Sequence, residues 1–513
     1  RMTPLEAELK KPLSVTNELF VDSGASNGVT PRRILFVASE VAPLVKVGGL
    51  ADVVGALPAA LARLGHDVRI LIPKYGVIAP ELIPIRGRMV SSDVPWQGRA
   101  VNIGLDESRL PGTAVPLYLL DAPGLFSGGT IYYEHSGSGG ARLAMERYVF
   151  FSWAVSRLLP QLKWSPDIIH CHDWHTAAVP ALLSLSTSHP PITVLTIHNM
   201  EGQGKWRAEE VFGWLGIRGD ELPALRRRDA PGNLNLLQLG IWAATAVNTV
   251  SPTYAQEVLT PTYGQGLERD LAGRPGGVGG ILNGIDFRVF DPATDAGIFA
   301  RYDVTASAIG KLSNKRALVS ELGLRPGHGP LFGFVGRLTA QKGMDLLPAS
   351  IPDIVVAGGQ LVVLGSGVPE VERLVATAVR PYADHCRVLI KFDPRLAQRI
   401  YAASDFFLMP SRFEPCGLGQ MIAMRYGALP IVRDTGGLHD TVRDVRTQPN
   451  GTGLLFRQAE AADLRGAVAA ALQLFKETDT ITVARRRAMT EDFSWHRSAQ
   501  AYVALYEHAL QAR

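Results

Sequence analysis

A strand pattern, a glycine-bearing turn and a helix pattern follow one another where regular patterning first begins in the chain, and this succession most constrains the fold. Residues 33–38 are short, apolar and partly β-branched, which is typical of a buried parallel strand. Apolar residues then recur at helical spacing over 50–64, and a second strand pattern follows at 66–72. A strand, a helix and a strand in this order predict the opening of a doubly wound α/β sheet.

The same alternation continues through the first half and restarts at residue 331. In the first half, strand patterns at 167–172, 192–198 and 246–251 end in polar residues, and open α/β sheets bind ligands at this carboxyl edge. In the second half we expect strands at 331–337, 360–365, 388–392, 405–410 and 429–432, and helices at 345–349 and 396–403. The chain therefore predicts two Rossmann-like α/β halves, and two domains without a shared site are the alternative.

These patterns divide the chain into four segments. We expect a flexible, polar N-terminal extension at 1–32, a first Rossmann-like domain at 33–285, a second at 286–489 and a C-terminal helix at 490–513. The join between the two domains is rich in Gly, Pro and Asn near 273–291. The last segment is amphipathic, and we expect it to cross back to the first domain.

Composition excludes several classes of protein. The formal net charge of +4 comes from 52 basic and 48 acidic residues, which is too balanced for a nucleic-acid or polybasic membrane role. The sequence has no apolar run near the ~20 residues that span a membrane. Three cysteines make no disulfide framework and indicate a reducing compartment. The first 33 residues lack a secretory apolar region, and whether they are a processed transit segment stays open.

The stretch from Lys46 to Asp52 lies between the first strand and the first helix. Gly48 and Gly49 let a ligand approach the backbone, and a helix N-terminus favours anions. Lys46 adds a positive charge suited to a phosphate oxygen. The motif indicates an anion-binding turn, and a simple tight turn is the alternative.

Three histidines stand close together at 170–175, after the third predicted strand. Neighbouring side chains of a strand point to opposite faces, and no second cluster supplies further ligands, so we expect no metal there. The arrangement instead indicates a strand end that delivers a histidine and Asp173 to substrate hydroxyl groups. The stretch that ends in His198 and Asn199 repeats this arrangement on the next strand.

Two further motifs follow strands of the second half. Arg337 and Lys342 come after one strand, and a guanidinium and an ammonium that converge are what a diphosphate leaving group needs; a solvated loop is the alternative. Glu414 lies at a later strand-to-helix turn, where residues 417–419 offer backbone donors. Cys416 in this turn is either a nucleophile or a packing or substrate-contact residue, and the latter is favoured because no base is fixed beside it.

Nine ordered stretches of the sequence resemble the bacterial and plant glycogen/starch synthases, glycosyltransferase family 5. They span nearly the whole chain in the family's order, which makes the set far more specific than any single stretch. The stretches are Lys46-Val-Gly-Gly-Leu, His172-Asp-Trp-His, Thr196-Ile-His-Asn, Thr249-Val-Ser-Pro-Thr-Tyr-Ala, Ile281-Leu-Asn-Gly-Ile-Asp, Arg337-Leu-Thr-Ala-Gln-Lys-Gly, Pro410-Ser-Arg-Phe-Glu-Pro-Cys-Gly-Leu, Asp434-Thr-Gly-Gly-Leu and Asp492-Phe-Ser-Trp.

The resemblance implies a GT-B fold with its active site in a cleft between the two domains. The implied reaction transfers glucose from ADP-glucose to the non-reducing end of an α-1,4-glucan or maltooligosaccharide, with retained configuration, without a metal or a cofactor. It implies a bacterial cytoplasmic location, or the plastid stroma if the N-terminus is a processed transit region. The residue roles that it implies are catalytic for Glu414, His175, Arg337 and Lys342, and substrate-binding for Lys46, Gly48, Gly49, Asp52, Asp173, His198, Asn199, Phe392, Cys416, Gly417 and Leu418.

Within this set, Arg337 and Lys342 would hold the diphosphate, Glu414 would contact the transferring glucose, and His175 would lie near its reacting centre. Phe392 falls where the family has an aromatic side chain that stacks on the adenine.

The sequence departs from the family pattern mainly in the first half. Gly202 stands where the family has a tyrosine, Leu143 and Ala144 stand where it has an Asp-Asn pair, and Gly419 replaces a threonine-like residue. The family's Phe-Leu-Lys-x-Gly stretch reads Leu-Leu-Gln-Leu-Gly at 236–240. We therefore expect an altered glucan length preference, priming behaviour or rate. The alternatives are a GT-B enzyme that uses UDP-glucose or a small acceptor, and a glucan-binding regulatory protein with weakened catalysis.

Overall fold

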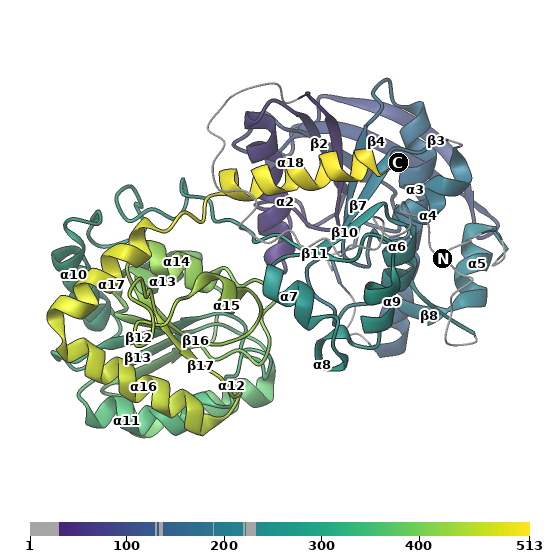
Figure 1. Cartoon of the computed structure of the whole chain (residues 1–513). Coiled ribbons are helices and arrows are strands. Elements are labelled where there is room, and N and C mark those ends of the chain that lie inside the picture. Colours follow the sequence, from purple (N-terminus) through teal and green to yellow (C-terminus); the bar gives the residue numbers. More distant parts are fainter. Residues whose placement is uncertain are drawn as a thin grey trace, which may run out of the picture. The chain divides into compact units, whose positions relative to one another are not determined.

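The computed structural model describes residues 30–128, 131–132, 137–187, 189–218, 221 and 232–512. Most of the predicted N-terminal extension, residues 1–29, lies outside the described residues. The chain divides into two compact units: residues up to Leu282 together with those from Trp495 onward form unit 1, and Asn283–Ser494 form unit 2. Figure 1 shows both units as sheets covered by helices.

Unit 1 is built on a nine-stranded sheet whose order in the described residues is β11-β10-β7-β6-β1-β2-β5-β4-β3. All neighbours in it are parallel except β4, which runs antiparallel to both β3 and β5. A separate antiparallel pair joins β8 and β9. The strands are β1 (Arg33–Val37), β2 (Asp67–Pro73), β3 (Gly87–Trp96), β4 (Arg99–Arg109), β5 (Pro116–Asp121), β6 (Ile168–His172), β7 (Ile192–Ile197), β8 (Lys205–Arg207), β9 (Asn233–Asn235), β10 (Ala246–Thr249) and β11 (Gly279–Gly280).

Helices cover this sheet and complete one continuous apolar core. They are α2 (Gly49–Arg63), η2 (Pro80–Leu82), α3 (Gly137–Leu158), η3 (Leu159–Gln161), α4 (Val179–Ser186), α5 (Ala208–Leu215), α6 (Leu236–Ala243), α7 (Pro252–Glu257), α8 (Pro261–Gly264), α9 (Glu268–Gly273) and α18 (Trp495–Gln511). The last of these, yellow in Figure 1, packs along α2. Trp495, Tyr502 and Tyr506 of α18 are buried in the core of unit 1. The predicted return of the C-terminal helix to the first half is therefore confirmed.

Unit 2 is built on a parallel sheet of order β14-β13-β12-β15-β16-β17. Its strands are β12 (Leu331–Val335), β13 (Gln360–Leu364), β14 (Cys386–Leu389), β15 (Phe406–Met409), β16 (Leu429–Arg433) and β17 (Leu454–Phe456). Its helices are α10 (Ser307–Glu321), η6 (Leu347–Ser350), α11 (Ile351–Val356), α12 (Pro369–Val379), η7 (Arg380–Tyr382), α13 (Pro394–Ala403), α14 (Gly419–Arg425), α15 (Gly436–Thr441), α16 (Ala461–Lys476) and α17 (Thr478–Thr490). The two doubly wound halves predicted from the sequence are confirmed.

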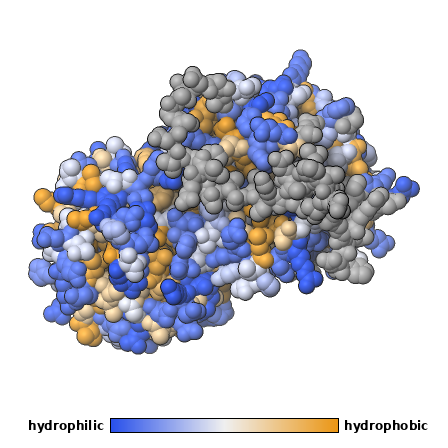
Figure 2. Space-filling view, viewed as in Figure 1, coloured by the Kyte–Doolittle hydropathy of each residue, from blue (hydrophilic) through white to orange (hydrophobic). Residues whose placement is uncertain are grey.

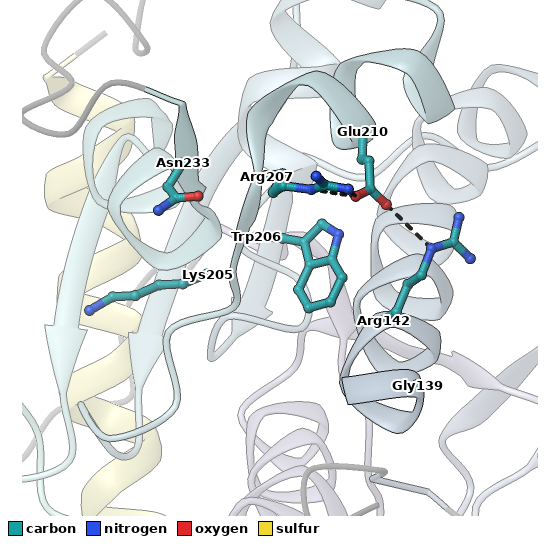
Figure 3. A pocket seen from close by; sticks show the side chains of 7 residues that line it. All are labelled: Gly139, Arg142, Lys205, Trp206, Arg207, Glu210 and Asn233. Carbon is teal, nitrogen blue, oxygen red and sulfur yellow. Dashed lines mark hydrogen bonds and ion pairs between the residues drawn. The ribbon is translucent and has the colours of Figure 1, made fainter. Parts of the chain in front are cut away.

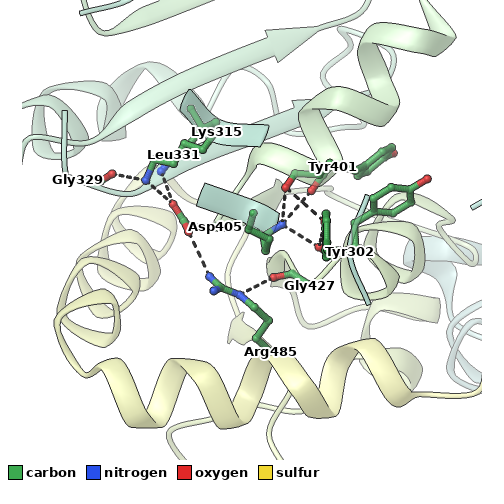
Figure 4. Close-up of polar contacts among 11 residues, drawn as sticks. Tyr302, Lys315, Gly329, Leu331, Tyr401, Asp405, Gly427 and Arg485 are labelled. Atoms are coloured by element: carbon green, nitrogen blue, oxygen red, sulfur yellow. Dashed lines mark hydrogen bonds and ion pairs between the residues drawn. The ribbon is translucent and has the colours of Figure 1, made fainter. Parts of the chain in front are cut away.

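Buried charges tie the helices of unit 2 to its sheet (Figure 4). Asp405, which precedes β15, accepts from Lys315 Nζ at 2.7 Å, from Arg485 Nη2 at 3.2 Å and from the Leu331 amide at 3.0 Å. One turn earlier on α10, Lys311 Nζ donates to three backbone carbonyls at 2.8–3.2 Å. Burial alone would raise the pKa of Asp405, but the charges of Lys315 and Arg485 hold it below its ordinary value. The cluster therefore links α10 and α17 to the start of two strands.

Three predicted elements differ from the structure. The helix predicted at 345–349 is a turn followed by η6, and the α-helix begins only at Ile351, where Pro348 and Pro352 lie in adjoining first turns. The strand predicted at 388–392 is instead β14, which ends at Leu389 and leaves Phe392 beyond the sheet. The C-terminal segment does not form one helix from residue 490, because α17 ends at Thr490 and α18 begins at Trp495.

The surface is mostly hydrophilic on the face shown, and the cysteines are buried. On the face seen in Figure 2, hydrophilic side chains predominate among the described residues and apolar ones are scattered. Among the described residues, no helix has the length and apolar character needed to cross a bilayer. Cys171, Cys386 and Cys416 are buried and free, and burial raises the pKa of the Cys416 thiol to about 12.

Candidate functional site

The predicted anion-binding turn of unit 1 connects β1 to α2. The amides of Val47 and Gly48 donate to Glu40 Oε2 at 2.5 and 3.1 Å, so a carboxylate of the chain occupies these two backbone donors. Ideal Cβ atoms built on Gly48 and Gly49 would meet no atom within 4 Å, which shows that the backbone is open to a ligand on this side. The turn is thus accessible on the Cβ side of the two glycines, and the Glu40 carboxylate stabilises it through the two amides.

Lys46 and Asp52 form an ion pair at the first turn of α2. Lys46 Nζ lies 2.6 Å from Asp52 Oδ1, and both side chains are partly exposed. Burial raises the pKa of Asp52, and the Lys46 charge opposes that rise. The ammonium that the sequence assigns to a phosphate oxygen is therefore paired with Asp52, to which the resemblance gives a substrate-binding role.

A closed hydrogen-bond network lies under the ends of β6 and β7. The side chain of Asn248 donates to the backbone carbonyl of Thr249 at 3.1 Å, so its oxygen is the acceptor for Thr196 Oγ1 at 2.8 Å. Thr196 then accepts from His170 Nε2 at 2.6 Å, and His170 Nδ1 accepts from Tyr506 at 2.8 Å. The Thr249 carbonyl at one end fixes the order of donors as far as His170 Nε2, which therefore carries a proton, and Nδ1 is the acceptor from Tyr506 when the ring is neutral. Burial lowers its pKa well below the ordinary value, in agreement with this assignment.

The predicted substrate-binding residues Asp173, His198 and Asn199 follow β6 and β7 directly. Asp173 adopts a positive φ of 55° and accepts from the His198 amide at 2.6 Å, which joins the two strand ends. His172 Nδ1 lies 3.0 Å from His198 Nε2, so one imidazole donates to the other. The structure therefore brings these residues together on one edge of the sheet, as the sequence predicts.

His175 lies in an aromatic box two residues beyond Asp173. Its ring stacks on Tyr132 at 4.7 Å and contacts Trp174 at 4.1 Å and Tyr148 at 4.6 Å between centroids. Neither ring nitrogen has a hydrogen-bond partner among the described residues, although the side chain is only 6% exposed. Burial lowers the pKa of His175 to about 3, so the ring is uncharged at neutral pH.

Sequence reasoning missed Glu40 and Tyr132. The Tyr132 hydroxyl donates to Glu40 Oε1 at 2.6 Å, so one side chain connects the glycine turn to the box around His175. Tyr132 stands 92 residues from Glu40 in a glycine-rich stretch without a motif, and no local pattern indicates the contact. Glu40 precedes the Lys46 stretch, and its acidic side chain before a glycine turn was a usable signal.

In unit 2, the loop that carries Arg337 and Lys342 leaves the end of β12. Gly343 closes this loop with a positive φ of 67°, and a Cβ there would lie 1.9 Å from the Pro410 carbonyl, so only glycine fits. Arg337 is exposed and donates to Gln341 Oε1 at 3.0 Å. The close packing on Pro410 places this loop beside the end of β15.

Lys342 and Glu414 meet at that point. Lys342 Nζ lies 2.6 Å from Glu414 Oε2, and the same oxygen accepts from Ser411 Oγ at 2.9 Å. Glu414 is buried, whereas Lys342 is partly exposed. The two strand-following motifs of the second half thus form one charged cluster, with Ser411 as a further member.

The turn after Glu414 is held by Gln420. Gln420 Nε2 donates to the carbonyls of Cys416 and Gly417, both at 3.0 Å, and Gly417 has a positive φ of 74°. Leu418 precedes α14, which begins at Gly419. The high pKa of the buried Cys416 thiol disfavours the nucleophile alternative and agrees with a packing role.

Phe392 is the remaining predicted residue of unit 2. Phe392 lies beyond the end of β14, and 81% of it is exposed to solvent. Within the described part of the chain, no group of three or more His, Cys, Asp or Glu side chains is arranged to hold a metal ion.

Two family models match the chain, one in each unit. Residues 33–273 match the starch synthase catalytic domain, and residues 329–474 match the group 1 glycosyl transferases. The catalytic domain of starch synthase IV from Arabidopsis thaliana, bound to ADP and acarbose, has a TM-score of 0.84 at 35% identity and covers 94% of this chain and 100% of that one. Sucrose-phosphate synthase from Thermosynechococcus elongatus shares the fold, with a TM-score of 0.59 at 21% identity over 94% of this chain and 100% of that one. The protein is therefore a glycosyltransferase with the two-domain GT-B fold.

Curated relatives narrow this class. The glycogen synthase of Rhodospirillum rubrum is 41% identical over 92% of this chain and 98% of its own length. That of Geotalea daltonii is 43% identical over 93% of this chain and 99% of its own length. The chain belongs to the glycogen and starch synthase family.

Proposed function

We propose that this enzyme moves glucose from ADP-glucose to the non-reducing end of an α-1,4-glucan, with retention of configuration. The observation that carries the proposal is the charged cluster of unit 2, in which Lys342 and Glu414 are in contact and Arg337 lies exposed on the same loop. The glycogen synthases among its relatives and the ADP- and acarbose-bound starch synthase support the choice of donor and acceptor.

The cluster of unit 2 fits the departure of a nucleoside diphosphate. The bond between the anomeric carbon and the diphosphate oxygen breaks, and negative charge grows on that oxygen. Arg337 and Lys342 stabilise this charge without a metal, since positive groups fixed in advance act most strongly where charge develops. Glu414 holds the Lys342 ammonium in place, and we assign it to the hydroxyl groups of the transferring glucose.

Unit 1 supplies neutral groups that fit sugars. His175 is uncharged at neutral pH, so it donates one N–H to a sugar hydroxyl rather than acting as a proton donor for the leaving group. The acceptor oxygen forms its new bond to the anomeric carbon, and its proton passes to the departing diphosphate. We assign Asp173, His198 and Asn199 to substrate hydroxyl groups.

The remaining predicted residues complete the donor contacts. We assign Lys46, Asp52 and the open backbone at Gly48 and Gly49 to the donor. In unit 2 we assign Phe392, Cys416, Gly417 and Leu418 to it as well. The support is the open backbone at the two glycines and the large exposed area of Phe392. Three buried free cysteines favour a reducing compartment, and we propose the bacterial cytoplasm or, for a processed N-terminus, a plastid stroma.

A donor comparison tests the proposal. Purified enzyme is incubated with radiolabelled ADP-glucose or UDP-glucose, each with and without maltoheptaose, and the products are separated by length. We expect a ladder of longer maltooligosaccharides with ADP-glucose and primer. A ladder only with UDP-glucose overturns the donor assignment, and a single short product overturns the glucan acceptor. Glucan binding without any elongation identifies a regulatory glucan-binding protein instead.

A further inference from the structure

Asp434 and His439 form a pair at the carboxyl edge of the unit 2 sheet, outside the residues assigned to the donor. Asp434 follows β16, and His439 lies on α15. His439 Nδ1 is 2.6 Å from Asp434 Oδ1, and 55% of the His439 side chain is exposed. We propose that His439 recognises a hydroxyl group of the transferring glucose and so helps to select the sugar of the donor. The proposal rests on the proposed function for the identity of that sugar.

The strand order of unit 2 places this pair beside the residue assigned to the glucose. The sheet is parallel and runs β14-β13-β12-β15-β16-β17, so the carboxyl ends of its strands share one edge. Phe392, predicted to stack on the adenine, follows β14, and Lys342, assigned to the diphosphate, follows β12. Glu414, assigned to the glucose, follows β15. With these assignments the donor spans three strand spacings, on the order of 14 Å, and β16 is the next strand beyond its glucose.

The turn after β16 packs directly on the turn that carries Glu414. The Gly437 amide donates to the Glu414 carbonyl at 3.0 Å. A Cβ on Gly437 would lie 2.2 Å from the Cys416 carbonyl oxygen, so this close approach requires glycine. His439 stands two residues beyond Gly437 on α15, and its ring bonds back to Asp434 at the end of β16. The imidazole is therefore held at the carboxyl edge of the sheet, next to the turn of Glu414.

Asp434 fixes one nitrogen of the imidazole and leaves the other for a ligand. An ionised carboxylate only accepts hydrogen bonds, so His439 Nδ1 is the donor to Asp434. Among the described residues, His439 Nε2 has no hydrogen-bond partner. A neutral imidazole accepts at this nitrogen and a protonated one donates there, and a hydroxyl group can answer either. A sugar hydroxyl is therefore a suitable partner for His439 in both states.

An ion-paired carboxylate of unit 1 shows the contrasting arrangement. In a pocket of about 590 Å³, Glu210 lies 2.6 Å from Arg207 and 3.3 Å from Arg142, so two guanidinium groups share one carboxylate (Figure 3). Charge-assisted hydrogen bonds of this kind are strong, and a ligand has to compete with them. At the end of β16, the Asp434 carboxylate engages one nitrogen of His439, and a ligand reaches the other without breaking that bond.

Calorimetric titration of the whole enzyme with ADP and with ADP-glucose, without an acceptor, separates the sugar from the nucleotide. We expect His439→Ala to raise the Kd of ADP-glucose by about tenfold and to leave the Kd of ADP unchanged, because ADP carries no glucose. Unchanged ADP binding also shows that the variant is folded. His439→Gln keeps a hydrogen-bonding group and should recover part of the loss. His328→Ala, at an exposed histidine in the loop before β12, is the matched control and should bind both ligands as the parent does.

Two results of this titration overturn the proposal. Equal weakening of ADP and ADP-glucose in His439→Ala shows that the pair supports the nucleotide site or the fold. Parental Kd values for both ligands show that His439 does not contact the donor.

Donor analogues identify the hydroxyl group. Initial rates with maltoheptaose are compared for ADP-glucose and for its 2-, 3-, 4- and 6-deoxy forms. His439→Ala should lower kcat/KM by about tenfold on ADP-glucose and should have no further effect on the analogue that lacks the partner hydroxyl. Asp434→Ala should show the same pattern with a smaller loss, as expected of a positioning residue that acts through His439. A loss of equal size on every donor overturns the proposal, because a purely structural change affects all of them alike.

Failure of the proposed function gives a different result. If His439→Ala binds ADP-glucose more weakly and ADP equally, but the parent elongates no glucan, His439 recognises the sugar and the acceptor assignment is wrong. If the parent binds UDP-glucose and not ADP-glucose, the donor assignment is wrong, and the same titrations with UDP and UDP-glucose decide the role of His439.

Discussion

The clusters at the strand ends of the two units differ in how they handle charge. In unit 2, Lys342 and Glu414 are in direct contact and Arg337 is exposed beside them. In unit 1, the groups at the ends of β6 and β7 are mostly neutral, with His170 and His175 uncharged inside aromatic surroundings. A diphosphate needs fixed positive charge, whereas sugar hydroxyls need neutral donors and acceptors. The two units therefore share a fold but differ in the chemistry of the groups at their strand ends.

Removal of a cation from unit 2 should have the largest effect. Arg337→Ala or Lys342→Ala should lower kcat by about 10²–10³-fold, because the leaving group loses a positive contact. Initial rates with ADP-glucose and maltoheptaose measure the effect. Val356→Ala, on the exposed surface of unit 2, serves as the control. Near-parental rates in either cation variant contradict the diphosphate assignment.

The carboxylate of the same cluster should separate binding from turnover. Glu414→Gln keeps the shape of the side chain but removes the charge that faces Lys342, so kcat should fall by about 10²-fold while the KM for ADP-glucose stays of the same order. Steady-state kinetics with donor varied at saturating primer give both numbers. Unchanged kcat shows that another carboxylate contacts the transferring sugar.

A neutral group of unit 1 should have a smaller effect. His175→Phe preserves the aromatic packing and removes the N–H, which leaves a sugar hydroxyl unpaired at a cost of about 1–3 kcal/mol. This corresponds to a loss in kcat/KM of about 5–150-fold. Because the pKa of His175 is about 3, the parent should show no ionisation of this residue in its rate profile between pH 5 and 8. Such an ionisation, lost in His175→Phe, contradicts a neutral role.

As the pH falls, unit 1 should lose stability before unit 2 does. The pKa values of His170, His172 and His175 are lowered by burial, so below about pH 6.5 the unfolded state binds protons that the folded state does not. Unit 1 should lose about 1.4 kcal/mol per pH unit for each of these histidines as the pH falls toward 4. The pKa of Asp405 is lowered, so the stability that it gives unit 2 is present above its unfolded pKa of about 3.8 and lost only as the pH falls below it.

Pulse proteolysis in urea at pH 7.0, 5.5 and 4.5, with peptides identified by mass spectrometry, follows each unit separately. Peptides from unit 1 should become sensitive first. His175→Phe removes one titrating group and should make the pH dependence of unit 1 shallower. Earlier cleavage of unit 2 contradicts the assignment of buried neutral histidines to unit 1.

The smallest predicted effect tests the network under β6 and β7. Tyr506→Phe leaves His170 Nδ1 buried without its donor and should lower the free energy of unfolding by about 1–3 kcal/mol, a few degrees in Tm. Tyr502→Phe on the same helix loses a contact with Asn248 that, at 3.4 Å, is longer than the 2.8 Å contact of Tyr506, and it should cost less. Thermal unfolding followed by calorimetry compares the two. An equal or larger loss in Tyr502→Phe shows that the proton order assigned to the network is wrong.

Much of the fold could be predicted because parallel strands buried on both faces leave continuous apolar runs in the sequence. The start of β1 at Arg33 and the strands β7, β12 and β13 followed these runs closely. The antiparallel strands β3 and β4 were missed, because their alternating and partly exposed residues give a weak signal. The helix predicted at 345–349 is a turn in the structure, because helical propensity does not show that Pro348 and Pro352 delay the start of the helix.

The residues of the site were predictable where they lie in a sequence motif and not where they lie outside one. Glu414 follows a strand in a recognisable turn, and the structure places Lys342 against it. Tyr132 contacts Glu40 and His175 from a stretch without any motif. Gly202 shows the same limit, since only the structure reveals that a Cβ there would lie 3.1 Å from Trp174, so a larger side chain requires that ring to move.

Unit 1 is assembled from two stretches of chain, with the whole of unit 2 between them. A ribosome releases the chain from its N-terminus, and domains generally fold as units in that order. Here the second unit is continuous and can finish first, whereas Tyr506 reaches His170, and Tyr502 reaches Asn248, only when the last helix has emerged. A nascent chain halted before Trp495 therefore carries a complete charged cluster and an open histidine network. The unit that begins synthesis is the last one to be completed.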